Sequence, residues 1–159
     1  MALNQTQLAT LKAAILAETD PTLVALRTAG DENGMAGWYN GSSTYVLWKS
    51  KVTIEQTGQA FNGAEWAGMT TANHTRLQTV AQYLSAYNPG LADVRTMFND
   101  IWSGAGGANT RAALLALWKR IATRAEKLYA AGTGSDATPG TPTFEGNISA
   151  QDVSDALRA

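Results

Sequence analysis

The stretch "NTRAALLALWKRIATRAEKLYAA", residues 109–131, carries the longest periodic pattern of apolar side chains in the sequence. Its apolar positions recur at alternating intervals of four and three residues: Leu114, Trp118, Ile121, Ala125 and Leu128. This spacing predicts one long amphipathic helix that ends at Gly132. Thr123 could cap a second helix, so a break near residues 122–123 is an alternative. We interpret Trp118 as an anchor of the hydrophobic core.

Similar patterns upstream predict further helices. Apolar stripes predict one helix over residues 71–86 and a second that runs through residue 102. Asn88-Pro89 is predicted to end the first helix and to cap the second. Side chains that can cap a helix predict four shorter helices, which follow Asn4, Asp20, Asp31 and Thr53.

The segment "TYVLWKSKV", residues 44–52, interrupts these helices. Its β-branched and aromatic residues favour extended structure. Its length would also allow one or two helical turns. We predict the extended form.

The sequence after Gly132 has the composition of a tether. "GTGSDATPGTPTFEG", residues 132–146, is rich in Gly, Ser, Thr and Pro, with a short strand predicted around Phe144. Ser149 and Asp152 form a capping box that begins a terminal helix, with Val153 on its apolar side. A helix this short is unstable alone in water, so it needs a surface on which to dock.

Together these patterns predict a mainly α fold. We expect a small helical bundle with a short irregular or β segment over residues 1–132. Residues 133–159, called the C-terminal arm below, are predicted to form an extended tether, a short strand and a short terminal helix. We expect this arm to lie outside the core and to contact a partner, with three residues as the docking side chains: Phe144, Val153 and Leu157.

The composition limits the classes of function. Charged residues make up 16% of the chain, against about 25% in ordinary globular domains, which suggests that part of the surface is covered. The formal net charge of −1 gives no general attraction to nucleic acid or membranes. The chain has no cysteine, which excludes disulfides, thiolate metal sites and a cysteine nucleophile. No stretch approaches the roughly 20 apolar residues of a membrane span, and we expect no signal peptide.

Residues with catalytic potential are few. His74 is the only histidine and has no partner motif for a zinc site or a catalytic triad. Asp93 and Asp100 lie two turns apart on one predicted helix, and nothing in the sequence places them across a cleft. "GAGGAN", residues 104–109, lacks the last glycine of a dinucleotide fingerprint. We therefore expect no enzyme activity, no cofactor and no bound metal.

Basic and aromatic residues are the candidates for binding. Three basic residues share one stripe of the predicted long helix: Arg120, Arg124 and Lys127. They form either a solvated flank or a contact surface for DNA phosphates or an acidic partner. The five tryptophans are interpreted as core and interface anchors, and a contact role stays open for three of them: Trp38, Trp48 and Trp66.

Several patches of the sequence resemble a group of small virion-associated proteins of tailed bacteriophages. The resemblance runs in patches over most of the chain: "LATLKAAILAETDP" (8–21), "WYN" (38–40), "RAEKLYAAGTG" (124–134) and "FEGNISAQDV" (144–153). It implies a virion structural protein that is made in the cytoplasm of the bacterial host. A small helical domain with a C-terminal arm is similar to the head–tail adaptor or connector proteins, which form a ring below the portal.

The resemblance also implies the partners. They are copies of the same chain in a ring, the portal protein, tail or nozzle proteins, and DNA in the channel, with no membrane anchor. The alternatives are another virion component, such as a tail-completion, decoration or baseplate protein, and a non-enzymatic module that binds sugar or nucleic acid.

Overall fold

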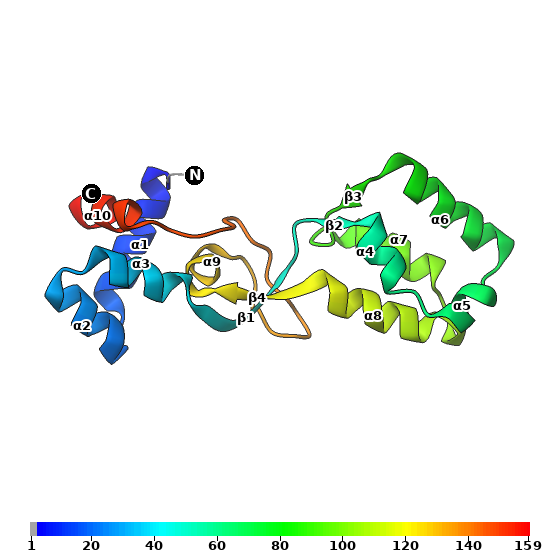
Figure 1. Cartoon of the computed structure of the whole chain (residues 1–159), viewed down its shortest axis with the longest axis horizontal. Helices are drawn as coiled ribbons and strands as arrows, with labels where there is room; N and C mark the ends of the chain where they lie inside the picture. The colour runs from blue at the N-terminus through cyan, green and yellow to red at the C-terminus, as the bar shows by residue number, and fades with distance from the viewer. Residues whose placement is uncertain (1–2) are drawn as a thin grey trace. The chain divides into compact units, whose positions relative to one another are not determined.

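The computed structural model describes residues 3–159 and divides the chain into two compact units (Figure 1). The first unit combines the N-terminal residues up to Leu47 with Ile121–Ala159, and the second unit is the continuous segment Trp48–Arg120. The predicted mainly helical fold is confirmed. The units differ from the predicted division at residue 132, because the C-terminal arm belongs to the same unit as the N-terminal helices.

From residue 3 onward, the first unit is built from five helices and most of a two-stranded sheet. Its helices are α1 (Gln5–Ala17), α2 (Pro21–Ala29), α3 (Glu32–Asn40), α9 (Arg124–Tyr129) and α10 (Ala150–Arg158). The strand β1 (Ser42–Trp48) pairs with β4 (Lys119–Thr123). The extended structure predicted for residues 44–52 is confirmed over most of its length, by β1 up to Trp48 and by β2 (Val52–Thr53) from Val52.

The second unit contains helices and a small antiparallel ladder. Its elements are β2 (Val52–Thr53), α4 (Ile54–Gln59), α5 (Gly63–Ala67), α6 (Thr71–Tyr83), β3 (Ala86–Tyr87), α7 (Ala92–Ile101), the 3-10 turn η1 (Ala105–Gly107) and α8 (Ala108–Trp118). In the ladder, Val52 lies opposite Tyr87.

The helix starts predicted at Asn4, Asp20, Asp31, Thr53 and Ser149 are confirmed. Capping boxes begin α1, α4 and α10, with Asn4, Thr53 and Ser149 as the respective N-caps. Asp20 caps α2, and Gly30 ends that helix in the left-handed conformation at φ 67°. The prediction for Asn88 was wrong, because its side chain accepts from Gly90 N at 2.7 Å and α7 begins only at Ala92.

The predicted long helix over residues 109–131 is wrong, and the break near Thr123 is correct. Helix α8 ends at Trp118, β4 follows, and Thr123 with Glu126 forms the capping box that begins α9. The apolar stripe divides between the units: Trp118 is buried in the core of the second, Ala125 in the core of the first, and Ile121 is 55% exposed. The stripe therefore serves two cores, which periodicity alone cannot distinguish.

The terminal helix docks on the chain's own first unit. Figure 1 shows α10 beside α1 and α3, and α10 packs against both. Phe144 and Val153 are buried in the first core, and Leu157 packs against it. The side-chain amide of Asn40 donates to Ile148 O at 2.8 Å and its oxygen accepts from Ile148 N at 2.9 Å. The prediction that the arm lies outside the core was therefore wrong: its apolar side chains find their surface within the chain.

The tether is held by backbone bonds to β1 and by Tyr45. Val46 N donates to Gly134 O at 2.7 Å, and Gly140 N donates to Val46 O at 2.9 Å. Tyr45 Oη donates to Gly132 O at 2.6 Å. A Cβ at Gly134, whose φ is 66°, would lie 2.2 Å from the Tyr45 ring. Glycine here lets the tether cross that ring in a left-handed conformation, which other residues rarely adopt.

The core of the second unit centres on Tyr87 and Trp118. The Tyr87 hydroxyl accepts from Trp118 Nε1 at 2.9 Å and lies 2.7 Å from Thr57 Oγ1. Both rings also contact Phe98. The predicted anchoring role of Trp118 is confirmed by its burial. Helix α6 ends at Tyr83, three residues earlier than predicted, because Tyr87 lies in β3.

Candidate functional site

The three predicted basic residues do not form one stripe. Arg124 and Lys127 lie on α9 and line a pocket of about 630 Å³, whereas Arg120 lies in β4 and does not line it. The Arg124 guanidinium stacks on the Trp38 ring at 4.5 Å, and its Nη1 donates to Trp38 O at 2.9 Å. Arg124 therefore ties α9 to the end of α3.

Acidic groups balance the positive charges of this pocket. Glu18 and Asp20 line it together with the two basic residues. The Thr22 amide, which donates to the Asp20 carboxylate, holds the pKa of that carboxyl below its ordinary value, and the positive charge of Arg124 lowers it further. Burial raises the pKa of Tyr39 to about 12, and the negative charge of Glu18 adds to this effect. The balanced charges give this pocket no net attraction for DNA phosphates.

The structure brings Asp93 and Asp100 to one groove. The groove has a volume of about 610 Å³, is lined by residues of α6 and α7, and places Arg76 with the two carboxylates. Val80 and Met97 add apolar lining. Sequence spacing put the carboxylates on one helix, but only the fold supplies the facing helix.

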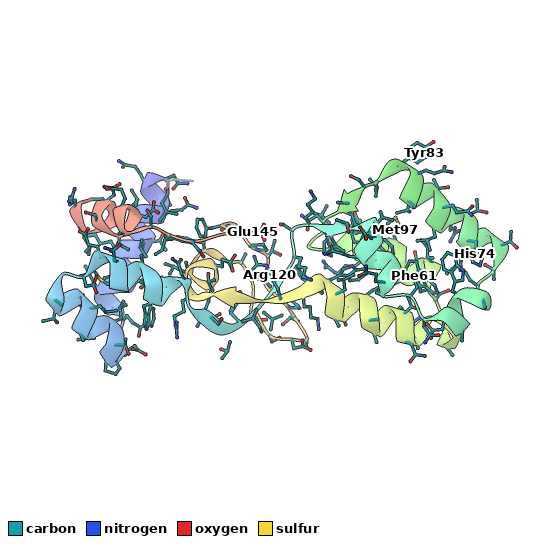
Figure 2. The ribbon with its side chains drawn as sticks, in the orientation of Figure 1. Phe61, His74, Tyr83, Met97, Arg120 and Glu145 are labelled. Carbon is teal, nitrogen blue, oxygen red and sulfur yellow. The ribbon has the colours of Figure 1, made fainter. Side chains whose placement is uncertain are left out.

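His74 and Trp66 belong to an aromatic cluster near α5, of which Figure 2 labels His74 and Phe61. The Trp66 ring stacks on Phe61 with ring centroids 5.5 Å apart. The His74 ring lies nearly perpendicular to the Trp66 ring, with centroids 4.6 Å apart. Trp102 completes the cluster, 4.9 Å from Phe61. These contacts give Trp66 and His74 structural roles in the second unit.

The start of α8, after the "GAGGAN" loop, is occupied by a carboxylate of the same unit. Glu65 accepts from Asn109 N and Thr110 N, each at 2.8 Å. Desolvation opposes ionisation of Glu65, but the bonds from Asn109 and Thr110 outweigh it and hold the pKa of the carboxyl below its ordinary value. Glu65 thus takes the place that an anion could occupy at this helix N-terminus.

Sequence reasoning missed a partly exposed uncharged segment. Residues 77–92 contain no Asp, Glu, Lys or Arg, and this run covers the end of α6 and the connection to α7. Tyr83 is 81% exposed, Leu91 56% and Leu84 38%. Figure 2 shows Tyr83 pointing away from the ribbon. The signal in the sequence is the absence of charged residues, which a pattern of apolar stripes does not reveal.

No family model, curated protein or solved structure matches the chain. Across residues 3–159, the side chains of His, Asp and Glu form no group of three or more that could hold a metal ion. None of the helices in the same range is long and apolar enough to cross a membrane.

Proposed function

We propose that this chain is a structural protein of a tailed-bacteriophage virion, a head–tail adaptor whose copies form a ring between the portal and the tail. The four patches of resemblance support the virion assignment. The observation that carries the assembly role is the uncharged segment 77–92, with its exposed Tyr83, Leu84 and Leu91.

The occupant of this surface is a neighbouring copy of the same chain. A segment without charged side chains adds no like-charge repulsion of its own when identical subunits approach, and the chain as a whole carries a net charge of only −1. Covering the three exposed side chains would contribute on the order of 3 kcal/mol for each contact. Such a contribution is modest alone, but a closed ring repeats it at every interface.

The arm has a different role from the one expected of an adaptor. Because Phe144 and Val153 are buried within the first unit, they are not free to reach the portal. The second unit, which exposes the uncharged segment, takes over the assembly contact in this proposal.

The test compares two exposed leucines by light scattering coupled to size exclusion. Leu91→Glu places a charge in the uncharged segment, and Leu16→Glu places the same charge on α1, where Leu16 is 57% exposed. We expect the wild type and Leu16→Glu to form rings, alone or with purified portal, and Leu91→Glu to remain monomeric. A wild-type chain that stays monomeric with and without portal would refute the proposal.

A further inference from the structure

A second pocket in the second unit differs in charge from those described above. It has a volume of about 560 Å³ and is lined by residues from α7, α8 and neighbouring loops: Trp48, Arg95, Asn99, Ser103, Gly104, Arg111, Ala112, Leu115 and Trp118. Among the residues that the structure describes, two arginines and no carboxylate line it. In the pocket of Arg124 and Lys127, acidic and basic side chains balance. The pocket of Arg95 and Arg111 is therefore the one suited to an anion.

Arg95 is fixed in place by two contacts. Its guanidinium lies 4.3 Å from the centroid of the Trp48 ring, and its Nη1 donates to Pro89 O at 2.5 Å. A guanidinium carries five N–H donors in a planar fork, so most of the donors of Arg95 remain for another acceptor. The stacking reduces the conformational freedom that ligand binding would otherwise have to remove.

Arg111 lies on α8 and is held by backbone carbonyls that follow α7. Its Nη1 donates to Trp102 O and to Gly104 O, the latter at 2.8 Å, near the end of α7. Within residues 3–159, neither Arg95 nor Arg111 pairs with a carboxylate, and the side chains of Asn99 and Ser103 form no hydrogen bonds. Two fixed cations and two unused polar groups therefore line one pocket.

We propose that this pocket binds the phosphate of a nucleotide, with Arg95 and Arg111 as the anion-binding pair. Arginine forks match the oxygens of a phosphate, and a phosphate monoester carries close to two negative charges at neutral pH. The pocket is much larger than one phosphate. Ala112 and Leu115, three residues apart on α8, supply exposed apolar lining for the sugar and base. This inference does not depend on the virion assignment.

The decisive variant changes charge without removing either arginine. Asn99→Asp keeps the size of an exposed side chain that makes no hydrogen bond and adds a negative charge to the pocket. Gln59→Glu is the matched control, because it makes the same change at an exposed position of α4 outside the pocket. Arg95→Gln removes one cation and serves as the second variant.

Binding is measured on the full chain by titration calorimetry and by amide NMR shifts, with adenosine 5′-monophosphate, a ten-residue oligothymidylate and inorganic phosphate as probes. We expect Asn99→Asp and Arg95→Gln to weaken binding by about tenfold or more, and Gln59→Glu to leave it unchanged. Binding of the monophosphate identifies a free nucleotide as the source, and binding of the oligothymidylate alone identifies a nucleic-acid strand.

Two results would overturn the inference. One is wild-type protein that binds neither nucleotide probe, or binds them unaffected by Asn99→Asp. The other is inorganic phosphate binding as tightly as the nucleotides, because the apolar lining would then contribute nothing.

Discussion

Replacing Val153 by alanine tests whether α10 belongs to the core of the isolated chain. Val153 is fully buried in the first unit, among side chains of α1 and α3, whereas an assembly contact would leave it exposed until a partner arrives. Val153→Ala removes two methyl groups and leaves a small cavity. The helix itself should persist, because alanine has the higher helix propensity.

The expected cost follows from burial. Each buried methylene-sized group contributes about 0.8 kcal/mol by transfer, and the residual cavity adds to this loss, which gives about 2–3 kcal/mol for the variant. In a chain of this length, 1 kcal/mol lowers the melting temperature by roughly 2–4 °C, so we expect a decrease of about 4–12 °C. An exposed site would lose less than about 0.5 kcal/mol.

The assay is thermal unfolding followed by circular dichroism on dilute chain without partners. Leu16→Ala is the control, because it removes a larger side chain from an exposed position of α1 and should change the melting temperature by no more than about 2 °C. If Val153→Ala melts within 2 °C of the wild type, α10 is not part of the core and the docking described above is wrong.

Two further predictions concern the first unit. Burial raises the pKa of Tyr39 to about 12, against about 10 in the unfolded chain. The contribution of the protonated Tyr39 to the free energy of unfolding is therefore complete below pH 10 and is lost between about pH 10 and 12. Tyr39→Phe should make the free energy of unfolding, measured in urea, less dependent on pH over that range. Gly134→Ala should lower the free energy of unfolding by about 1–3 kcal/mol. Residue 134 has a φ of 66°, which alanine rarely adopts, and its Cβ would clash with the Tyr45 ring. Adding Tyr45→Ala should make the combined loss smaller than the sum of the two single losses, and strict additivity in chemical denaturation would contradict the proposed clash.

Local signals were sufficient to predict where most helices begin. The capping boxes at Asn4, Thr53 and Ser149 depend on side chains only three residues apart, so the interaction that begins each helix is visible in the sequence. The extended segment at β1 was predicted from its β-branched and aromatic residues. These predictions required no knowledge of which surfaces meet.

Predictions that required a partner surface failed. Periodicity correctly indicated that Trp118 and Ala125 are buried, but the two side chains enter different cores, with β4 between their helices. The composition of residues 132–146 indicated a tether, but the ring of Tyr45, almost ninety residues earlier, holds it in place. For the same reason the pocket of Arg95 and Arg111 could not be foreseen, since the fold brings together residues that have no shared motif.

The discontinuous first unit also has a consequence for folding. Residues 48–120 form a continuous unit and can complete their core as soon as they have been synthesised. The first unit cannot, because α1 and α3 lack the buried side chains of Phe144, Val153 and Ala156 until the final helix exists. Domains that fold during synthesis do so when their contacts are available, so the second unit should form first. Until then the apolar surface of the N-terminal helices stays exposed. It becomes buried when the arm pairs with β1 and α10 packs against α1 and α3.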